Sequence, residues 1–166
     1  THNRLLSFGL EMYLEVIAID PDAPTLPHPR WFDLDNFHGP ARLTNWVLRV
    51  DELQKSIARS PQGVGTPSAQ QRGDLAWEIS IPDNGKIPFD GCFPALIEWG
   101  ASGSAAKRLP DQGCRLLELT IYHPRDAALR LALAPLIQSR LLRVRQAAKA
   151  CIIAQIETPS GIRVLK

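Results

Sequence analysis

The stretch Phe93-Pro94-Ala95-Leu96-Ile97-Glu98-Trp99-Gly100 decides the fold of this chain. It has the length and the apolar content of a buried strand, yet it carries one acid, Glu98. A buried carboxylate is costly unless it is paired, hydrogen-bonded or bound to a cation, so Glu98 lies either at an edge facing water or in a site. A second apolar run, Met12 to Ile19, holds Glu15 in the same way. The two runs predict a pocket with two carboxylates.

The composition limits the classes of function. With 19 basic and 17 acidic residues, the 166-residue chain lacks the positive surplus of a nucleic-acid-binding protein. No run approaches the ~20 apolar residues that span a bilayer, and we expect neither a signal peptide nor a membrane partner. The cations between Arg140 and Lys149 lack interleaved aromatic residues, which favours a solvated face.

The three cysteines point to a reducing compartment. Cys92, Cys114 and Cys151 lie far apart and have no Cys-x-x-Cys spacing, so neither a disulfide framework nor a structural zinc is expected. Free cysteines are most often small buried side chains. We therefore expect a cytoplasmic protein.

The order of the predicted elements repeats along the chain. The first set has strands at 43–50, 68–72, 75–82 and 93–100, with a short helix capped by Asp51. The second set has a strand at 115–122, a helix beginning at Pro124 and capped by His123, and strands at 141–144, 151–158 and 162–165. Both sets predict a β-α-β-β-β module, at 43–100 and at 115–166. A hairpin at 3–19 matches the last two strands of such a module, so we expect the first module to be amino-terminally incomplete.

A proline-rich connection follows the hairpin. It carries Trp31, Phe32 and Phe37, and aromatic side chains on a long loop serve either as a lid over the domain or as a plug at the bottom of its core. The sequence leaves these two alternatives open.

Five motifs accompany the repeated module, and together they match the pattern of a known family. They are Thr1-His2-Asn3-Arg4-Leu5-Leu6, Tyr13-Leu14-Glu15-Val16-Ile17, Arg30-Trp31-Phe32, Arg72-Gly73-Asp74-Leu75-x-Trp77 and Leu96-Ile97-Glu98-Trp99-Gly100. On these residues the chain resembles the glyoxalase-like domain proteins of the vicinal-oxygen-chelate (glyoxalase/bleomycin-resistance/dioxygenase) superfamily. The resemblance implies an α+β fold in which β-α-β-β-β modules form curled mixed sheets, an open barrel around a cavity. Residues 1–100 would form the glyoxalase-like domain and residues 115–166 a third module.

The resemblance also implies catalytic and metal-binding positions. Glu15 and Glu98 take the last-strand places of the family, as catalytic residues and, with His2, as ligands of a divalent metal of unknown identity. The first-strand place falls near Asn45 and Trp46, which are poor ligands, whereas a first-row metal usually needs three or four. The third module has no carboxylate in its last strand, so it is expected to brace the fold or a homodimer interface.

Four residues are expected to bind the substrate. The resemblance places His2 and Asn3 near the mouth of the cavity, although a frayed, solvated chain end is the alternative. Arg72 would contact an anion, or else form a surface pair with Asp74. Trp77 completes this set.

The expected partner is a small molecule, for which two functions are open. The first is an enzyme of the lyase, isomerase or dioxygenase type, in which a metal acts as Lewis acid while a glutamate moves a proton. The alternative is a non-catalytic module that binds or sequesters a small molecule without metal. A purely structural role is a third option, because fold does not fix function.

Overall fold

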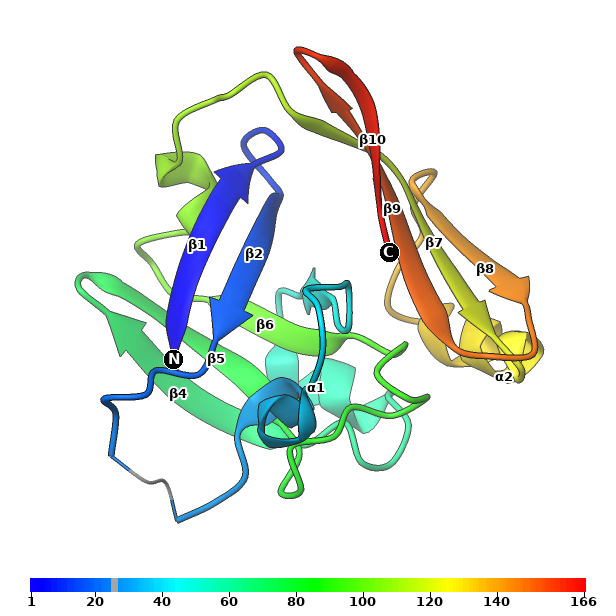
Figure 1. Ribbon diagram of the computed structural model, residues 1–166. Coiled ribbons are helices and arrows are strands. Elements are labelled where there is room, and N and C mark those ends of the chain that lie inside the picture. Colours follow the sequence, from blue (N-terminus) through cyan, green and yellow to red (C-terminus); the bar gives the residue numbers. More distant parts are fainter. Residues whose placement is uncertain (25–26) are drawn as a thin grey trace.

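The computed structural model describes residues 1–24 and 27–166 as a mixed α+β protein (Figure 1). The first elements are β1 (His2–Ser7), β2 (Tyr13–Ala18), the 3-10 helix η1 (Trp31–Asn36), β3 (Val47–Arg49), α1 (Leu53–Ala58), β4 (Thr66–Arg72), β5 (Leu75–Ile81) and β6 (Ala95–Trp99). The chain continues with the 3-10 helix η2 (Ala105–Arg108), β7 (Arg115–His123), α2 (Asp126–Leu133), β8 (Leu142–Gln146), β9 (Cys151–Thr158) and β10 (Gly161–Leu165). Within these described residues the strands form curled mixed sheets and no closed barrel, which confirms the expected fold class.

The middle sheet has the strand order β3-β6-β5-β4. Its central strand β6 runs parallel to β3 and antiparallel to β5. Ala95, Leu96 and Ile97 are at most 7% exposed because neighbours cover both faces of this strand. Burial on both faces explains why the sequence is continuously apolar there rather than alternating.

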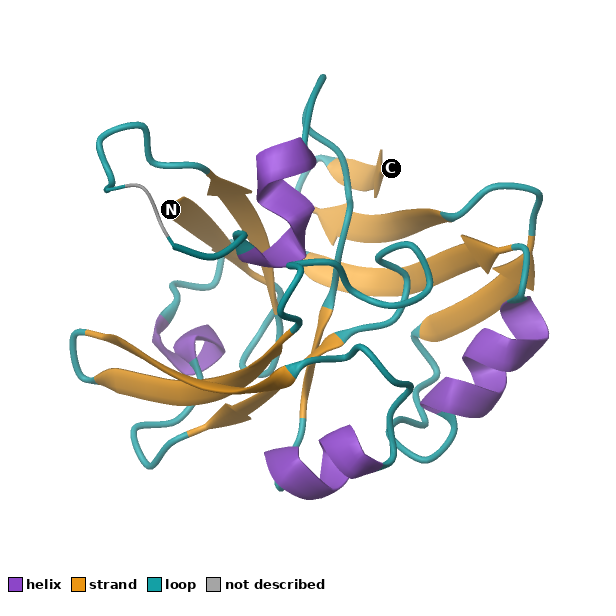
Figure 2. Cartoon of the chain, turned by 90° about the horizontal axis from the view of Figure 1, so that it is seen from below, coloured by secondary structure: helices purple, strands orange, loops and turns teal. Residues whose placement is uncertain are grey.

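The hairpin of β1 and β2 lies between the two four-stranded sheets (Figure 1). On one side, Leu6 and Leu14 pack against an apolar cluster that includes Ala154 of β9. On the other side, Glu11 of the hairpin turn pairs with Arg49 of β3 at 2.5 Å. Helix α1 covers the opposite side of the middle sheet from this hairpin (Figure 2).

The third sheet has the strand order β10-β9-β7-β8. Its elements follow the expected β-α-β-β-β order, as do β3 to β6, but the strands pair differently. Strand β7 lies between β8, which is parallel to it, and β9, which is antiparallel. The last strand β10 is therefore an edge strand, whereas β6 is central. One hydrophobic core spans both units, since it contains Leu53 and Phe93 together with Ile121 and Leu129.

The elements around the first helix differ in their bounds from those expected. The predicted strand 43–50 is shorter, Val47–Arg49, and α1 follows Glu52 rather than Asp51. The aromatic residues Trp31 and Phe32 pack against the main core, as the plug alternative predicts.

The second helix begins at Asp126, two residues later than predicted. His123, expected to cap it, is buried and accepts at Nδ1 the N–H of Arg125, the residue before the helix, at 3.0 Å. Its Nε2 lies 3.3 Å from a carboxylate oxygen of Asp90, which ties the third sheet to the loop before β6.

Cys92 and Cys114 are buried, as expected of free cysteines, whereas Cys151 is exposed. Within the described ranges, no helix is long and apolar enough to cross a membrane.

Candidate functional site

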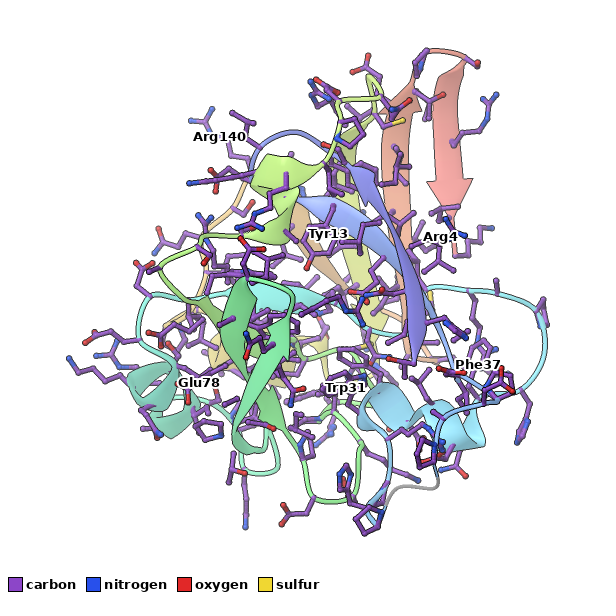
Figure 3. All side chains as sticks on the ribbon, turned by 90° about the vertical axis from the view of Figure 1, so that its left-hand side faces the viewer. Arg4, Tyr13, Trp31, Phe37, Glu78 and Arg140 are labelled. Carbon is purple, nitrogen blue, oxygen red and sulfur yellow. The ribbon has the colours of Figure 1, made fainter. Side chains whose placement is uncertain are left out.

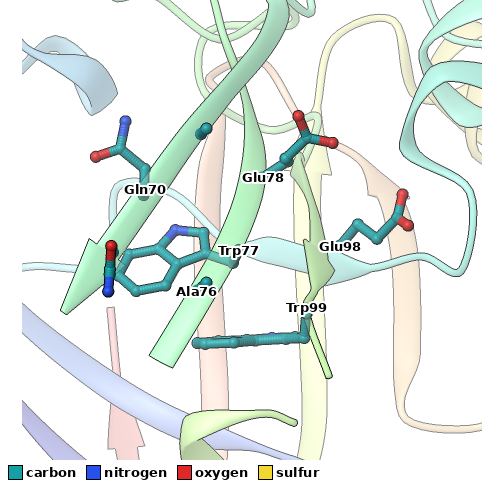
Figure 4. A pocket seen from close by; sticks show the side chains of 9 residues that line it. Gln70, Ala76, Trp77, Glu78, Glu98 and Trp99 are labelled. Atoms are coloured by element: carbon teal, nitrogen blue, oxygen red, sulfur yellow. The ribbon is translucent and has the colours of Figure 1, made fainter. Parts of the chain in front are cut away.

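An open pocket of about 440 Å³ lies on strands β4, β5 and β6 (Figure 4). Its lining residues come from these three strands and the residue after β6: Ala69, Gln70, Gln71, Ala76, Trp77, Glu78, Glu98, Trp99 and Gly100. Two of the residues predicted from the sequence, Glu98 and Trp77, are among them.

The glutamates and the tryptophans of this pocket point to opposite faces of the sheet. Glu78 is directly opposite Glu98 in the ladder of β5 and β6, and Trp77 is directly opposite Trp99. Because successive residues of a strand alternate between faces, the carboxylates share one face and the indoles share the other. Figure 4 shows the glutamates pointing away from the tryptophans, whose ring centroids are 5.3 Å apart.

On the face of the sheet that carries Glu78 and Glu98, the neighbouring residues are small. Ala69 is opposite Glu78, and Gly100 donates its N–H to the carbonyl of Ala76 at 2.9 Å. A Cβ at position 100 would lie 3.0 Å from that carbonyl oxygen, which is tighter than ordinary contacts allow. Small side chains therefore leave room above the strands, beside the two glutamates.

The carboxylate of Glu98 is hydrogen-bonded to helix α1. Its Oε2 accepts the backbone N–H of Leu53, the first residue of the helix, at 2.6 Å. The first N–H groups of a helix have no partner inside the helix, and a negative charge at this end is favourable. This bond answers why an acid is tolerated in an otherwise apolar strand.

Glu78 has no such partner. It is exposed, and within the described part of the chain it makes neither a hydrogen bond nor an ion pair. Like charges directly opposite each other in a ladder destabilise a sheet by roughly 0.2–1 kcal/mol. The pair Glu78 and Glu98 thus forms a negative centre that a positive group would stabilise.

A second polar centre lies on the hairpin. Asn3 donates from Nδ2 to Oε1 of Glu15 at 2.9 Å and accepts a hydrogen bond from the guanidinium of Arg72. Burial, and then the charge of Glu15, raise the pKa of Tyr13 to about 12. The structure therefore brings together Glu15, Asn3 and Arg72, three of the residues predicted from the sequence.

The two polar centres are on opposite sides of the middle sheet. Arg72 is opposite Leu75 in the ladder and so lies on the face of the indoles, toward the hairpin. Glu98 points to the other face, toward α1. Figure 3 shows Glu78 on the side of α1 and Tyr13 on the hairpin. The expectation that Glu15 and Glu98 meet in one pocket is therefore wrong, because the alternation of side chains along β6 turns Glu98 away from the hairpin. The catalytic roles of the two residues stay predictions.

The expected metal ligands do not gather either. His2 lies 3.1 Å from Asp20, with 67% of its side chain exposed, and Glu15 and Glu98 have the separate partners given above. Across residues 1–24 and 27–166, no group of three or more His, Cys, Asp or Glu side chains is placed to hold a metal ion. These residues do not fit the three-ligand site that the resemblance implied.

The alternative of an Arg72–Asp74 pair is not what the structure shows. Asp74 instead pairs with Arg108 of η2 at 2.6 Å, and this contact holds the pKa of the Asp74 carboxyl below its ordinary value.

Glu78 is the residue that the sequence analysis missed. Side chains alternate in direction along the strand at 75–82, so the sequence does indicate that Glu78 and Trp77 point to opposite faces of the sheet. The neighbour of Glu78 across the sheet depends on strand register, which a single sequence does not show.

The family described as glyoxalase-like domain matches residues 1–137, from β1 to just beyond α2. No curated protein and no solved structure matches the chain.

Proposed function

Because the chain belongs to the glyoxalase-like domain family, we propose that it binds a small molecule through a cationic group held between Glu78 and Glu98. One observation carries this proposal: the pocket is lined by two glutamates at directly opposite positions of the β5–β6 ladder, and Glu78 has no hydrogen-bond or ion-pair partner among the described residues. A cation between them would turn a repulsive pair into two charge-assisted contacts, which are stronger than neutral hydrogen bonds.

The same geometry favours a binding module over a metal enzyme. Binding of an organic cation needs only the two carboxylates and the open floor beside them. A metal-dependent reaction needs at least one further ligand, and the described side chains do not supply it.

The proposal is tested by following backbone amide signals during titration with 1,3-diaminopropane, a dication at neutral pH. Matched titrations with 1,3-propanediol, a neutral analogue, and with sodium chloride control for shape and for ionic strength. We expect shifts at β4, β5 and β6 with the diamine alone. Equal shifts with the diol, or shifts scattered over the surface, would contradict a cation site.

Two variants test whether binding of the diamine requires the negative charge of Glu78. Glu78→Gln keeps the shape of the side chain and removes its charge, so binding of the diamine should weaken about tenfold or more, the loss of one charged contact of ~1.5–3 kcal/mol. Glu157→Gln, an exposed glutamate on β9 that is distant from the pocket in the fold, is the control and should bind as the wild type does.

The hairpin centre supports a second candidate, an enzyme that uses Glu15. The bonds among Arg72, Asn3 and Glu15 hold a carboxylate in a fixed orientation, as a general base requires. Metal analysis of the purified protein tests the metal-dependent form of this candidate, which needs a third ligand beyond the described side chains. Stoichiometric divalent metal in the wild type that is lost in Glu15→Gln and kept in Glu98→Gln would favour this enzyme. Absence of bound metal from the wild type would favour the binding module.

A further inference from the structure

Glu98 takes part in both the pocket and the start of α1. We infer that it couples the two, so that a ligand in the pocket stabilises the first turn of the helix, and the helix in turn raises the affinity of the pocket. This inference rests on the proposed cation site.

Helix α1 depends on support from outside. It has six residues, Leu53–Ala58, whereas isolated helices shorter than about 12–15 residues are marginal in water. The side chain of Glu52, the residue at the N-cap, accepts no hydrogen bond from a backbone N–H of the helix and instead pairs with the side chain of Lys55 at 2.5 Å. The cap comes from Glu98, which lies 45 residues further along the chain.

The carboxylate of Glu98 has enough acceptor sites to bind the helix and a cation at the same time. Oε2 of Glu98 accepts the N–H of Leu53, and the group has further acceptor sites for a cation beside Glu78. A cation bound there would fix the side chain in the rotamer that caps the helix. Coupling between two equilibria is reciprocal, so a weaker helix must also weaken ligand binding.

The helix carries this effect to a second cavity. Residues of the helix line a polar cavity of about 250 Å³, with contributions from Lys55 and Ser56 of α1, from Arg59 just after it, and from Pro135 and Leu136 beyond α2. Fixing the first turn of α1 would therefore fix one wall of this cavity.

The first experiment needs no ligand. Amide hydrogen exchange is measured at Ser56, whose N–H donates to the carbonyl of Glu52 and so reports opening of the first turn. In Glu98→Ala, exchange at Ser56 should be about tenfold faster, as expected for loss of an N-cap. Glu98→Gln keeps an oxygen acceptor and should stay close to the wild type. Glu78→Ala is the matched control, because among the described residues Glu78 makes no hydrogen bond or ion pair with α1. Unchanged exchange in Glu98→Ala would overturn the link between Glu98 and the helix.

The second experiment measures the reciprocal effect with 1,3-diaminopropane as the probe. Lys55 lies outside the pocket, so Lys55→Gly weakens the helix without touching the site, and Lys55→Ala loses the same pair with Glu52 but keeps the helix. We expect the glycine variant to bind the probe two- to fivefold more weakly than the alanine variant, within the glycine–alanine difference in helix propensity.

The outcomes separate the two proposals. Equal affinity of the two Lys55 variants, with faster exchange at Ser56 in the glycine variant, would overturn the coupling and leave the pocket standing. Absence of probe binding in the wild type would overturn the proposed function, and the coupling with it.

Discussion

The two four-stranded sheets have the same order of elements and different positions for their last strands. Strand β6 is inserted between β3 and β5, whereas β10 is added at the edge of its sheet. The exposed fraction of Leu96 is 0% and that of Val164 is 53%. The comparison teaches that element order alone does not determine which strand forms the centre of a sheet, and that the centre is where the pocket and its acids are found.

The two sheets also differ in the route of the chain after each helix. Gly65 has φ +97°, and a Cβ there would lie 2.1 Å from the backbone carbon of Ile81, so only glycine lets the chain pass so close to the end of β5. Strand β4 begins at the next residue, Thr66, which pairs with Ile81 of β5, and β6 occupies the place next to β3. After α2, the chain instead returns directly to β7 as the parallel strand β8.

The largest effect we predict concerns the two last strands themselves. Leu96→Ala leaves a cavity in the shared core and should lower the free energy of unfolding by about 3 kcal/mol. Val164→Ala removes a half-exposed side chain and should change it by less than about 0.5 kcal/mol. Urea denaturation of both variants checks this. Similar losses would mean that β10 is as well covered as β6.

The hairpin between the two sheets gives a prediction at high pH. The phenol of Tyr13 has a pKa of about 12 in the folded protein, against 10.0 unfolded. The unfolded chain therefore ionises first, and this contribution to stability is complete below pH 10 and is lost as the pH rises toward 12. From pH 9 to 12 the wild type should lose about 2 kcal/mol more than Tyr13→Phe, since one pKa unit corresponds to ~1.4 kcal/mol. Unfolding of both proteins across this range measures the difference, and parallel curves would place Tyr13 in water.

The smallest effect concerns the two opposed acids of β5 and β6, Glu78 and Glu98. Glu78→Gln relieves the repulsion with Glu98 and should stabilise the ligand-free protein by about 0.5 kcal/mol. The thermal midpoint without ligand reports this gain. A loss of stability would show that Glu78 has a favourable partner after all.

The sequence allowed the architecture to be predicted because its signals are local. The apolar run at 93–100 predicted a buried strand, and the signals at Asp51 and Pro124 predicted both helices. The family motifs led to three residues that do meet, Asn3, Glu15 and Arg72. Strand pairing was not accessible, because register and sheet order depend on contacts between distant segments. For the same reason, the faces to which Glu15 and Glu98 point could not be compared.

The bond between Glu98 and Leu53 bears on how loss-of-function variants in this family member would be interpreted. A mutational scan would score Glu98→Ala as damaging, and an acid at a family position invites assignment to chemistry. Here the same score would arise from fraying of a helix, so folding and function must be assayed separately at this one residue.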